Sequence, residues 1–204
     1  ANKVETLMEA MPYLQKYQGK IIVIKYGGNA MINEELKDAV MHDVVLLKLL
    51  GMKPVLSHGG GPGINKMLEK LDIPVEFIEG LRYTSADIMR VVEMVLVGQV
   101  NTELVGFINK LGGKAVGLSG VSGDIYPCPQ RDEVHGYIPV IAPVGTDGQG
   151  HTFNINGDTA AGKLASALGA EKLVILTDIE GLCNDIKIRD VISYLNIEDV
   201  KALK

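Results

Sequence analysis

Two short apolar runs, each ending in a glycine-rich turn, constrain the fold of this chain more than any other feature. The run at residues 20–26 (KIIVIKY) leads into Gly27 and Gly28, and the run at residues 53–57 (KPVLS) leads through His58 into three glycines at 59–61. A helical pattern follows each turn. Short β-branched runs that alternate with helices are typical of a parallel sheet covered on both faces. Bare backbone N–H groups in such turns can close around an anion.

The rest of the chain continues this alternation. Further strands are expected at residues 115–118, 138–142 and 172–177, and helices at 34–50, 63–71, 85–111 and 158–168, with Ser85 as an N-cap. The sequence therefore predicts an α/β fold, a three-layer αβα sandwich around a central, mainly parallel sheet. Ligands of such sheets bind beyond the carboxyl ends of the strands, where both glycine turns fall.

Residues 4–18 precede this alternation and carry apolar residues at helical spacing. Pro12 lies inside the pattern, so we expect a kink or two short helices. The apolar stripe needs a cover, either the chain's own domain or a neighbouring subunit.

Composition excludes several classes of function. The formal net charge of -5 argues against non-specific nucleic-acid binding. No apolar run is expected to approach the roughly 20 residues that span a bilayer. Cys128 and Cys183 have no CxxC spacing and are interpreted as reduced thiols of a cytoplasmic protein. The histidines His42, His135 and His151 have no metal-ligand spacing, so no metal site is expected.

Several polar residues stand where strands turn into helices. Lys25 ends the first apolar run beside Gly27, a placement that favours contact with a phosphate over a solvated surface charge. Asn154 and Asp158 flank a strand-to-helix turn, which is also compatible with a simple N-cap. The segment 157–164 (GDTAAGKL) nearly spells a P-loop, but Leu164 stands where a Ser or Thr should reach Mg²⁺, so a helix is expected there instead.

Seven strings, in order from about residue 20 to 182, together resemble the amino acid kinase family. They are VIKYGGNAM (23–31), KPVLSHGGGP (53–62), GLRYT (80–84), VEMVLVGQVN (92–101), GYIPVIAPVG (136–145), FNINGDTAAGKLASALGAEKL (153–173) and LTDIEGL (176–182). Within the family, they are most similar to the members that phosphorylate the γ-carboxylate of N-acetyl-L-glutamate in arginine biosynthesis. Several such strings in family order are far more specific than any one alone.

The resemblance implies three sets of site residues. Catalysis would fall to Lys25 and Asp158. Gly60, Gly61, Arg82 and Asn154 would bind the substrate. The nucleotide-binding residues would be Lys25, Gly27, Gly28, Thr177 and Asp178.

The resemblance also implies partners and an organisation. ATP with Mg²⁺ would be the donor, L-arginine a feedback inhibitor, and the assembly a homo-oligomer, a dimer or a hexamer built as a trimer of dimers. Residues 1–18 would form an oligomerisation helix beside the arginine site, residues 19–145 the acetylglutamate lobe, and residues 146–204 part of an ATP lobe. A carboxylate acceptor with a reference pKa of about 4.3 is already an anion at neutral pH and needs no general base.

The chain departs from the family pattern in two places. The family has a β-hairpin and a helix in the region between Ser119 and Gly136, where this chain is short, and it continues beyond Leu182 with a second phosphate-binding lysine. If the chain is a truncated form, we expect it to bind acetylglutamate but to transfer phosphate poorly or not at all. The alternatives are another amino acid kinase, acting on glutamate, carbamate, aspartate or UMP, and a non-catalytic arginine-sensing or oligomerising fragment.

Overall fold

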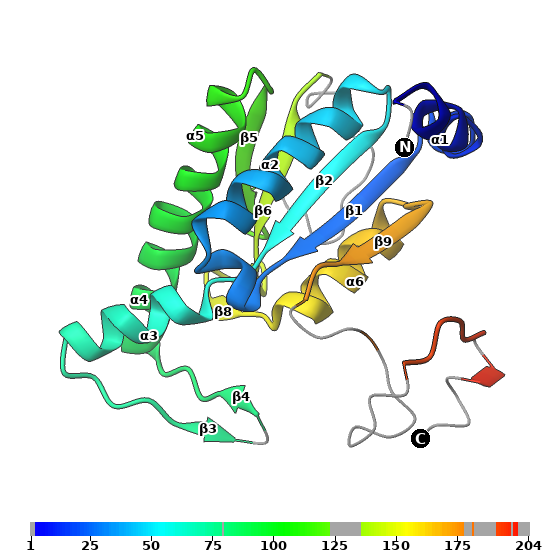
Figure 1. The fold of residues 1–204 in the computed structure, drawn as a ribbon. Coiled ribbons are helices and arrows are strands. Elements are labelled where there is room, and N and C mark those ends of the chain that lie inside the picture. The colour runs from blue at the N-terminus through cyan, green and yellow to red at the C-terminus, as the bar shows by residue number, and fades with distance from the viewer. Residues whose placement is uncertain are drawn as a thin grey trace.

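A computed structural model describes residues 3–78, 80–122, 136–177, 181, 191–196 and 198–199. Its centre is a five-stranded sheet in the order β5-β6-β2-β1-β9 (Figure 1). Every neighbouring pair in this sheet is parallel, so all five carboxyl ends lie at one edge. The strands are β1 (Ile21–Tyr26), β2 (Lys53–His58), β5 (Ala115–Ser119), β6 (Ile138–Ala142) and β9 (Lys172–Ile175). The expected parallel α/β fold is confirmed.

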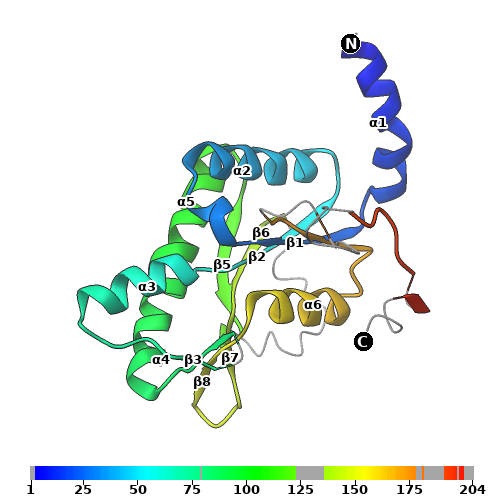
Figure 2. The ribbon, with the colours of Figure 1, turned by 60° about the horizontal axis from the view of Figure 1, so that its bottom comes forward.

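Helices cover both faces of this sheet (Figure 2). Helices α2 (Glu34–Leu49) and α5 (Thr102–Lys110) lie on one face, and α6 (Gly157–Ala167) lies on the other. Strand alternation assigns side chains to the two layers. Ile22 and Ile24 pack in the cluster that includes residues of α2 and α5, while Val23 packs with Ala161 and Leu164 of α6. The three-layer sandwich is confirmed.

The expected long helix at 85–111 consists of three segments. Helix α4 (Ala86–Glu93) begins at Ser85, whose hydroxyl accepts a hydrogen bond from the N–H of Ile88 at 3.3 Å, so the predicted N-cap is confirmed. The π-helical segment η2 (Met94–Asn101) follows and leads into α5. Within the described residues, the helix at 86–110 is long and apolar enough to cross a membrane, which corrects the expectation that no such run exists. Its buried residues pack into two hydrophobic core clusters, although only 39% of its apolar window is buried.

Shorter elements surround the carboxyl edge of the sheet. Helix α3 (Gly61–Lys70) begins two residues earlier than expected, because Pro62 suits the first helical turn. A 3₁₀ turn, η1 (Gly28–Met31), follows β1. Two antiparallel hairpins were not expected from the sequence: β3 (Phe77–Ile78) with β4 (Leu81–Arg82), and β7 (Val144–Thr146) with β8 (Thr152–Asn154).

The N-terminal segment forms one helix, α1 (Lys3–Tyr17), which contains Pro12. Of the two expected alternatives, a kink or two short helices, the second is therefore wrong. Proline at position 12 removes the hydrogen bond to the carbonyl of Met8, and in an exposed helix water can satisfy that group. No residue of α1 is buried, and the helix projects from the rest of the fold (Figure 2). Leu14 and Tyr17, near its C-terminal end, pack against the core. The described part of the chain leaves the rest of the apolar stripe uncovered, with Leu7 and Met8 each 64% exposed.

Candidate active site

The two glycine turns lie side by side at the carboxyl edge of the sheet. Tyr26 and His58, the last residues of β1 and β2, are direct partners in the parallel register. The N–H of Gly59 donates a 2.8 Å hydrogen bond to the carbonyl of Tyr26, which ties the second turn to the end of the first strand. A Cβ atom on Gly27 would lie 3.8 Å from the backbone nitrogen of Gly59. The fold therefore brings the two expected anion-binding turns into one place.

Lys25 reaches from β1 to the beginning of α6. Its Nζ lies 3.0 Å from Oδ1 of Asp158, and 14% of its side chain is exposed against 57% for Asp158. Asn156 caps α6, because its Oδ1 accepts from the N–H groups of Asp158 and Thr159 at 3.0 and 3.1 Å. The two predicted catalytic residues therefore form an ion pair at a helix N-terminus, although they come from distant parts of the sequence.

Glycine leaves the space around Lys25 open. A Cβ on Gly27 would come within 3.1 Å of Lys25 Nζ, closer than an ordinary van der Waals contact. A Cβ on Gly157 would lie 3.7 Å from Lys25 Cε and 4.0 Å from Gly59 Cα. Gly27 and Gly157 thus lie beside the end of the Lys25 side chain, and Gly59 lies next to Gly157. Such an arrangement combines a positive charge with N–H donors and is suited to a phosphate or carboxylate.

Arg82, at the end of β4, is held beside α3. Its Nη2 donates to Oδ1 of Asn65 at 2.5 Å, and its guanidinium lies 4.9 Å from the centre of the Phe77 ring. Burial lowers the pKa of Arg82 below its usual range. Within the part of the chain that the structure describes, its Nη1 is buried without a hydrogen-bond partner. A buried guanidinium nitrogen of this kind has room in its donor set for an anionic ligand.

Asn154 is connected to Arg82 through Thr84. The Nδ2 of Asn154 donates to Thr84 Oγ1 at 3.3 Å, and that hydroxyl donates to the carbonyl of Arg82 at 3.2 Å. Strand β8 and the β3–β4 hairpin therefore meet at the two residues expected to bind the substrate. That binding role stays a prediction.

Gly60 and Gly61 stand at the beginning of α3. Gly60 occupies the N-cap position and offers no side-chain cap, so the first N–H groups of this helix have no capping oxygen. A Cβ atom on Gly60 would collide with the terminal methyl group Cδ2 of Leu96 in η2, so any other residue at this position requires that methyl group to shift. Gly60 also lines a cavity of about 270 Å³ between α2, α3 and α5. Gly61 is exposed and its Cβ direction is open.

The expected nucleotide residues are described only in part. Gly28 is exposed with a φ of 64°, which favours glycine. Thr177 follows β9, which pairs with β1 such that Ile175 lies opposite Lys25. Asp178 lies outside the described residues, as do Cys128, Cys183 and His135. Among the residues that are described, no group of three or more His, Cys, Asp or Glu could hold a metal ion.

Sequence reasoning missed Asn65, whereas it placed Asn156 in a turn that could act as an N-cap. Asn65 holds Arg82, and Asn156 caps the helix that carries Asp158. The signal for Asn156 was its position before a helix, whereas no local pattern marks Asn65 as the partner of an arginine in another element. His58 is a packed strand-end residue: it is 0% exposed, and burial lowers its pKa from 6.5 to about 4.

The fold is the α/β fold of the amino acid kinases, and the chain belongs to the amino acid kinase family, which residues 20–203 match. It is 47% identical to an acetylglutamate kinase of Heliobacterium modesticaldum, over 98% of this chain and 79% of that protein. It is 46% identical to the chloroplastic acetylglutamate kinase of Arabidopsis thaliana, over 99% of this chain and 64% of that protein.

Among solved structures, the chain resembles an N-acetylglutamate synthase from Neisseria gonorrhoeae, in complex with coenzyme A and N-acetyl-glutamate. The TM-score is 0.74 at 23% identity, covering 91% of this chain and 48% of the other, a likeness of fold. The alignment with the Heliobacterium protein extends over 234 positions against the 204 residues of this chain, so that relative has residues at internal positions where this chain has none.

Proposed function

We propose that this chain phosphorylates the γ-carboxylate of N-acetyl-L-glutamate with ATP, giving N-acetyl-L-glutamyl 5-phosphate, a step of arginine biosynthesis. Its family membership and the shared name of its relatives support the reaction. The observation that carries the proposal is the Lys25–Asp158 pair, at 3.0 Å, among the backbones of Gly27, Gly59 and Gly157.

The chemistry needs charge neutralisation more than proton transfer. The attacking carboxylate is an anion at neutral pH, and it must approach an anionic phosphoryl group in line. Lys25 would stabilise the transferring group, and Asp158 would orient the Lys25 ammonium through their ion pair. The N–H groups around the glycine turns would hold the reacting oxygens without side-chain bulk.

Arg82 and Asn154 would bind the other carboxylate of acetylglutamate. The unpartnered Nη1 of Arg82 supports this role, because a carboxylate would supply the missing acceptor. Gly60 and Gly61 would bind the reacting end through the uncapped beginning of α3. The substrate would then extend from the sheet edge to the β3–β4 hairpin.

On the donor side, Gly27 and Gly28 would contact the phosphates of ATP, and Thr177 and Asp178 would lie near the nucleotide. Mg²⁺ would enter as part of the ATP substrate. We assign residues 19–145 to the acetylglutamate lobe and residues 146–204 to part of the ATP lobe, in a cytoplasmic enzyme.

Helix α1 would mediate oligomerisation. Its exposed apolar residues, among them Leu7 and Met8, support contact with a second copy of the chain. Residues 1–18 would then link dimers into a hexamer and border a site for L-arginine as feedback inhibitor.

Trapping of the acyl phosphate as a hydroxamate tests the reaction. Acetylglutamate should yield ATP-dependent hydroxamate, whereas glutamate, aspartate, carbamate and UMP should not support turnover. Lys25→Met should abolish the signal, and Lys163→Met, which alters an exposed lysine of α6, should leave it unchanged. Turnover of another acceptor in preference to acetylglutamate would replace the substrate assignment. Product formation by Lys25→Met at the wild-type rate would refute the role of the pair.

A further inference from the structure

The last residues of β1 and β2 share an unusual environment. Tyr26 and His58 are partners in the register, and both are 0% exposed. Tyr26 packs in the cluster on the α2 and α5 face of the sheet, and His58 contacts Asn101, at the junction of η2 and α5. Their neighbour Lys25 points to the opposite face, toward α6. Two polar side chains are therefore buried directly behind the glycine turns, where burial of apolar side chains would cost less free energy.

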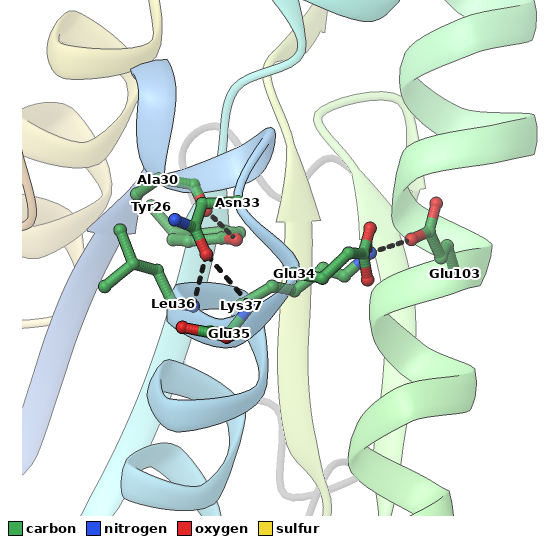
Figure 3. A network of polar contacts seen from close by, with 8 residues as sticks. All are labelled: Tyr26, Ala30, Asn33, Glu34, Glu35, Leu36, Lys37 and Glu103. Carbon is green, nitrogen blue, oxygen red and sulfur yellow. Dashed lines mark hydrogen bonds and ion pairs between the residues drawn. The ribbon is translucent and has the colours of Figure 1, made fainter.

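Tyr26 spans the turn that follows its own strand. Its hydroxyl donates a 2.8 Å hydrogen bond to the carbonyl of Ala30, four residues further on, and thereby encloses Gly27 and Gly28 (Figure 3). Burial raises the pKa of this hydroxyl to about 12, so it remains a donor at any physiological pH. The far end of the turn is thus fixed to a buried ring.

The segment after Ala30 is also fixed. Asn33 caps α2, because its Oδ1 accepts from the N–H groups of Glu35 and Leu36 at 2.9 and 3.0 Å (Figure 3). The ammonium of Lys37 bridges Glu34 at 2.8 Å and Glu103 of α5 at 2.6 Å, which joins α2 to α5. Burial alone would lower the pKa of Lys37, but the hydrogen bonds that its ammonium donates to the two carboxylates raise it. The turn therefore lies between two anchored points.

His58 holds the second turn, and its tautomer follows from its neighbours. Asn101 Nδ2 lies 2.8 Å from the carbonyl of Val140, which can only accept, so this atom is the amide NH₂. The same nitrogen lies 3.0 Å from His58 Nε2, which must therefore accept. The ring proton is then on Nδ1, which donates to the carbonyl of Gly59 at 2.7 Å. This bond orients the peptide group between Gly59 and Gly60, the first one within the triple-glycine turn.

Asn101 can make these bonds because the surrounding elements leave room for it. It is the last residue of η2 and is 4% exposed. Its Oδ1 occupies the place where a Cβ on Gly117 of β5 would stand. Any side chain at position 117 would displace the amide from His58. The contact is thus built into three elements, η2, β5 and β2.

We propose that Tyr26 and His58 are positioning residues, each of which holds the glycine turn that follows its own strand. Tyr26 sets the turn assigned to the nucleotide, and His58 sets the turn assigned to acetylglutamate. These ligand assignments rest on the proposed function. The link from Gly59 N–H to the carbonyl of Tyr26 keeps the two turns in a fixed relation to each other.

Conservative substitutions separate the two contacts. Tyr26→Phe removes only the hydroxyl, and Tyr194→Phe, at an 80% exposed tyrosine, is its control. His58→Gln keeps an acceptor for Asn101 but loses the Nδ1 donor, whereas His58→Asn keeps a donor at the δ position.

Calorimetric titrations measure the affinity of each variant for the two ligands. For Tyr26→Phe, binding of a non-hydrolysable ATP analogue with Mg²⁺ should be about tenfold weaker, equivalent to about 1.4 kcal/mol. Its affinity for acetylglutamate should stay within about twofold of wild type. His58→Gln should show the reverse selectivity, and His58→Asn should restore acetylglutamate affinity.

Glycine amide signals of the ¹⁵N-labelled protein test the contacts without any ligand. Tyr26→Phe should shift Gly28 and accelerate its hydrogen exchange while Gly61 is unchanged, and His58→Gln should do the opposite. In the wild type, ring ¹⁵N shifts should show the proton of His58 on Nδ1. If the wild-type protein binds neither ligand but the two variants show these glycine effects, the proposed function is refuted and the positioning roles remain intact. An Nε2–H tautomer, or variants that lose thermal stability with both affinities and glycine signals unchanged, would overturn the positioning roles.

Discussion

Acidification should unfold this protein partly through one buried histidine. Burial lowers the pKa of His58 to about 4 in the folded chain, against 6.5 for an exposed histidine. Below pH 6.5, His58 therefore binds a proton in the unfolded chain but not in the folded chain. The contribution of His58 to stability is complete above pH 6.5 and is lost as the pH falls toward 4. The two pKa values give a loss of about 2 kcal/mol at pH 5 and about 3 kcal/mol at pH 4.

Urea unfolding between pH 7 and pH 4, followed by circular dichroism, measures this loss. Other groups titrate as well, including Asp147, whose pKa is lowered by its hydrogen bond with His151. His58→Gln corrects for them, because glutamine keeps the acceptor for Asn101 and does not titrate. The variant should start less stable and lose about 3 kcal/mol less than wild type on acidification to pH 4. Equal losses in the two proteins would show that the His58 ring is protonated without cost and would refute the argument from burial.

Three further predictions concern the site directly. Lys25→Met should lower kcat at least about 100-fold in the coupled kinase assay, because one charge-stabilising donor is lost, while Lys163→Met should not. Arg82→Ala should raise the KM for acetylglutamate about 100-fold with little change for ATP, and the exposed Arg90→Ala is the matched control; an unchanged KM would exclude the carboxylate clamp. Gly60→Ala should destabilise the fold by about 1–3 kcal/mol in thermal unfolding, since its methyl group collides with η2, and wild-type stability would contradict the tight approach.

The large elements of this fold could be predicted because they have strong local patterns. The run at 20–26 and the helix that begins at Ser85 were recognised from β-branched residues and from a capping side chain. Strand order could not be predicted, because pairing of β1 with β9 joins distant residues and leaves no local pattern. The two hairpins could not be predicted for a different reason. Their strands have only two or three residues, which is too short for an alternation of apolar and polar residues to be recognised.

The π-helical segment η2 had no signal in the sequence. Apolar periodicity in the region fits an α-helix, and the wider turns of a π-helix become stable only through tertiary contacts. Here Asn101 supplies such contacts, with the carbonyl of Val140 and the ring of His58. The sequence marked Asn101 only as part of a string that resembles a family, not as the partner of His58.

The expected site residues were inferred from strings that resemble a family. The faces to which the strand-end residues point are a result of strand alternation. Successive residues of a strand point to opposite faces, so Lys25 can face α6 only while Tyr26 faces α2 and α5. The same rule makes His58 the partner of Tyr26 rather than of Lys25. Each strand end thus supplies a chemical group to one face and an anchor for its turn to the other. Because a shift of one residue in β1 would exchange these faces, the register of the sheet and the geometry of the active site are a single constraint on this sequence.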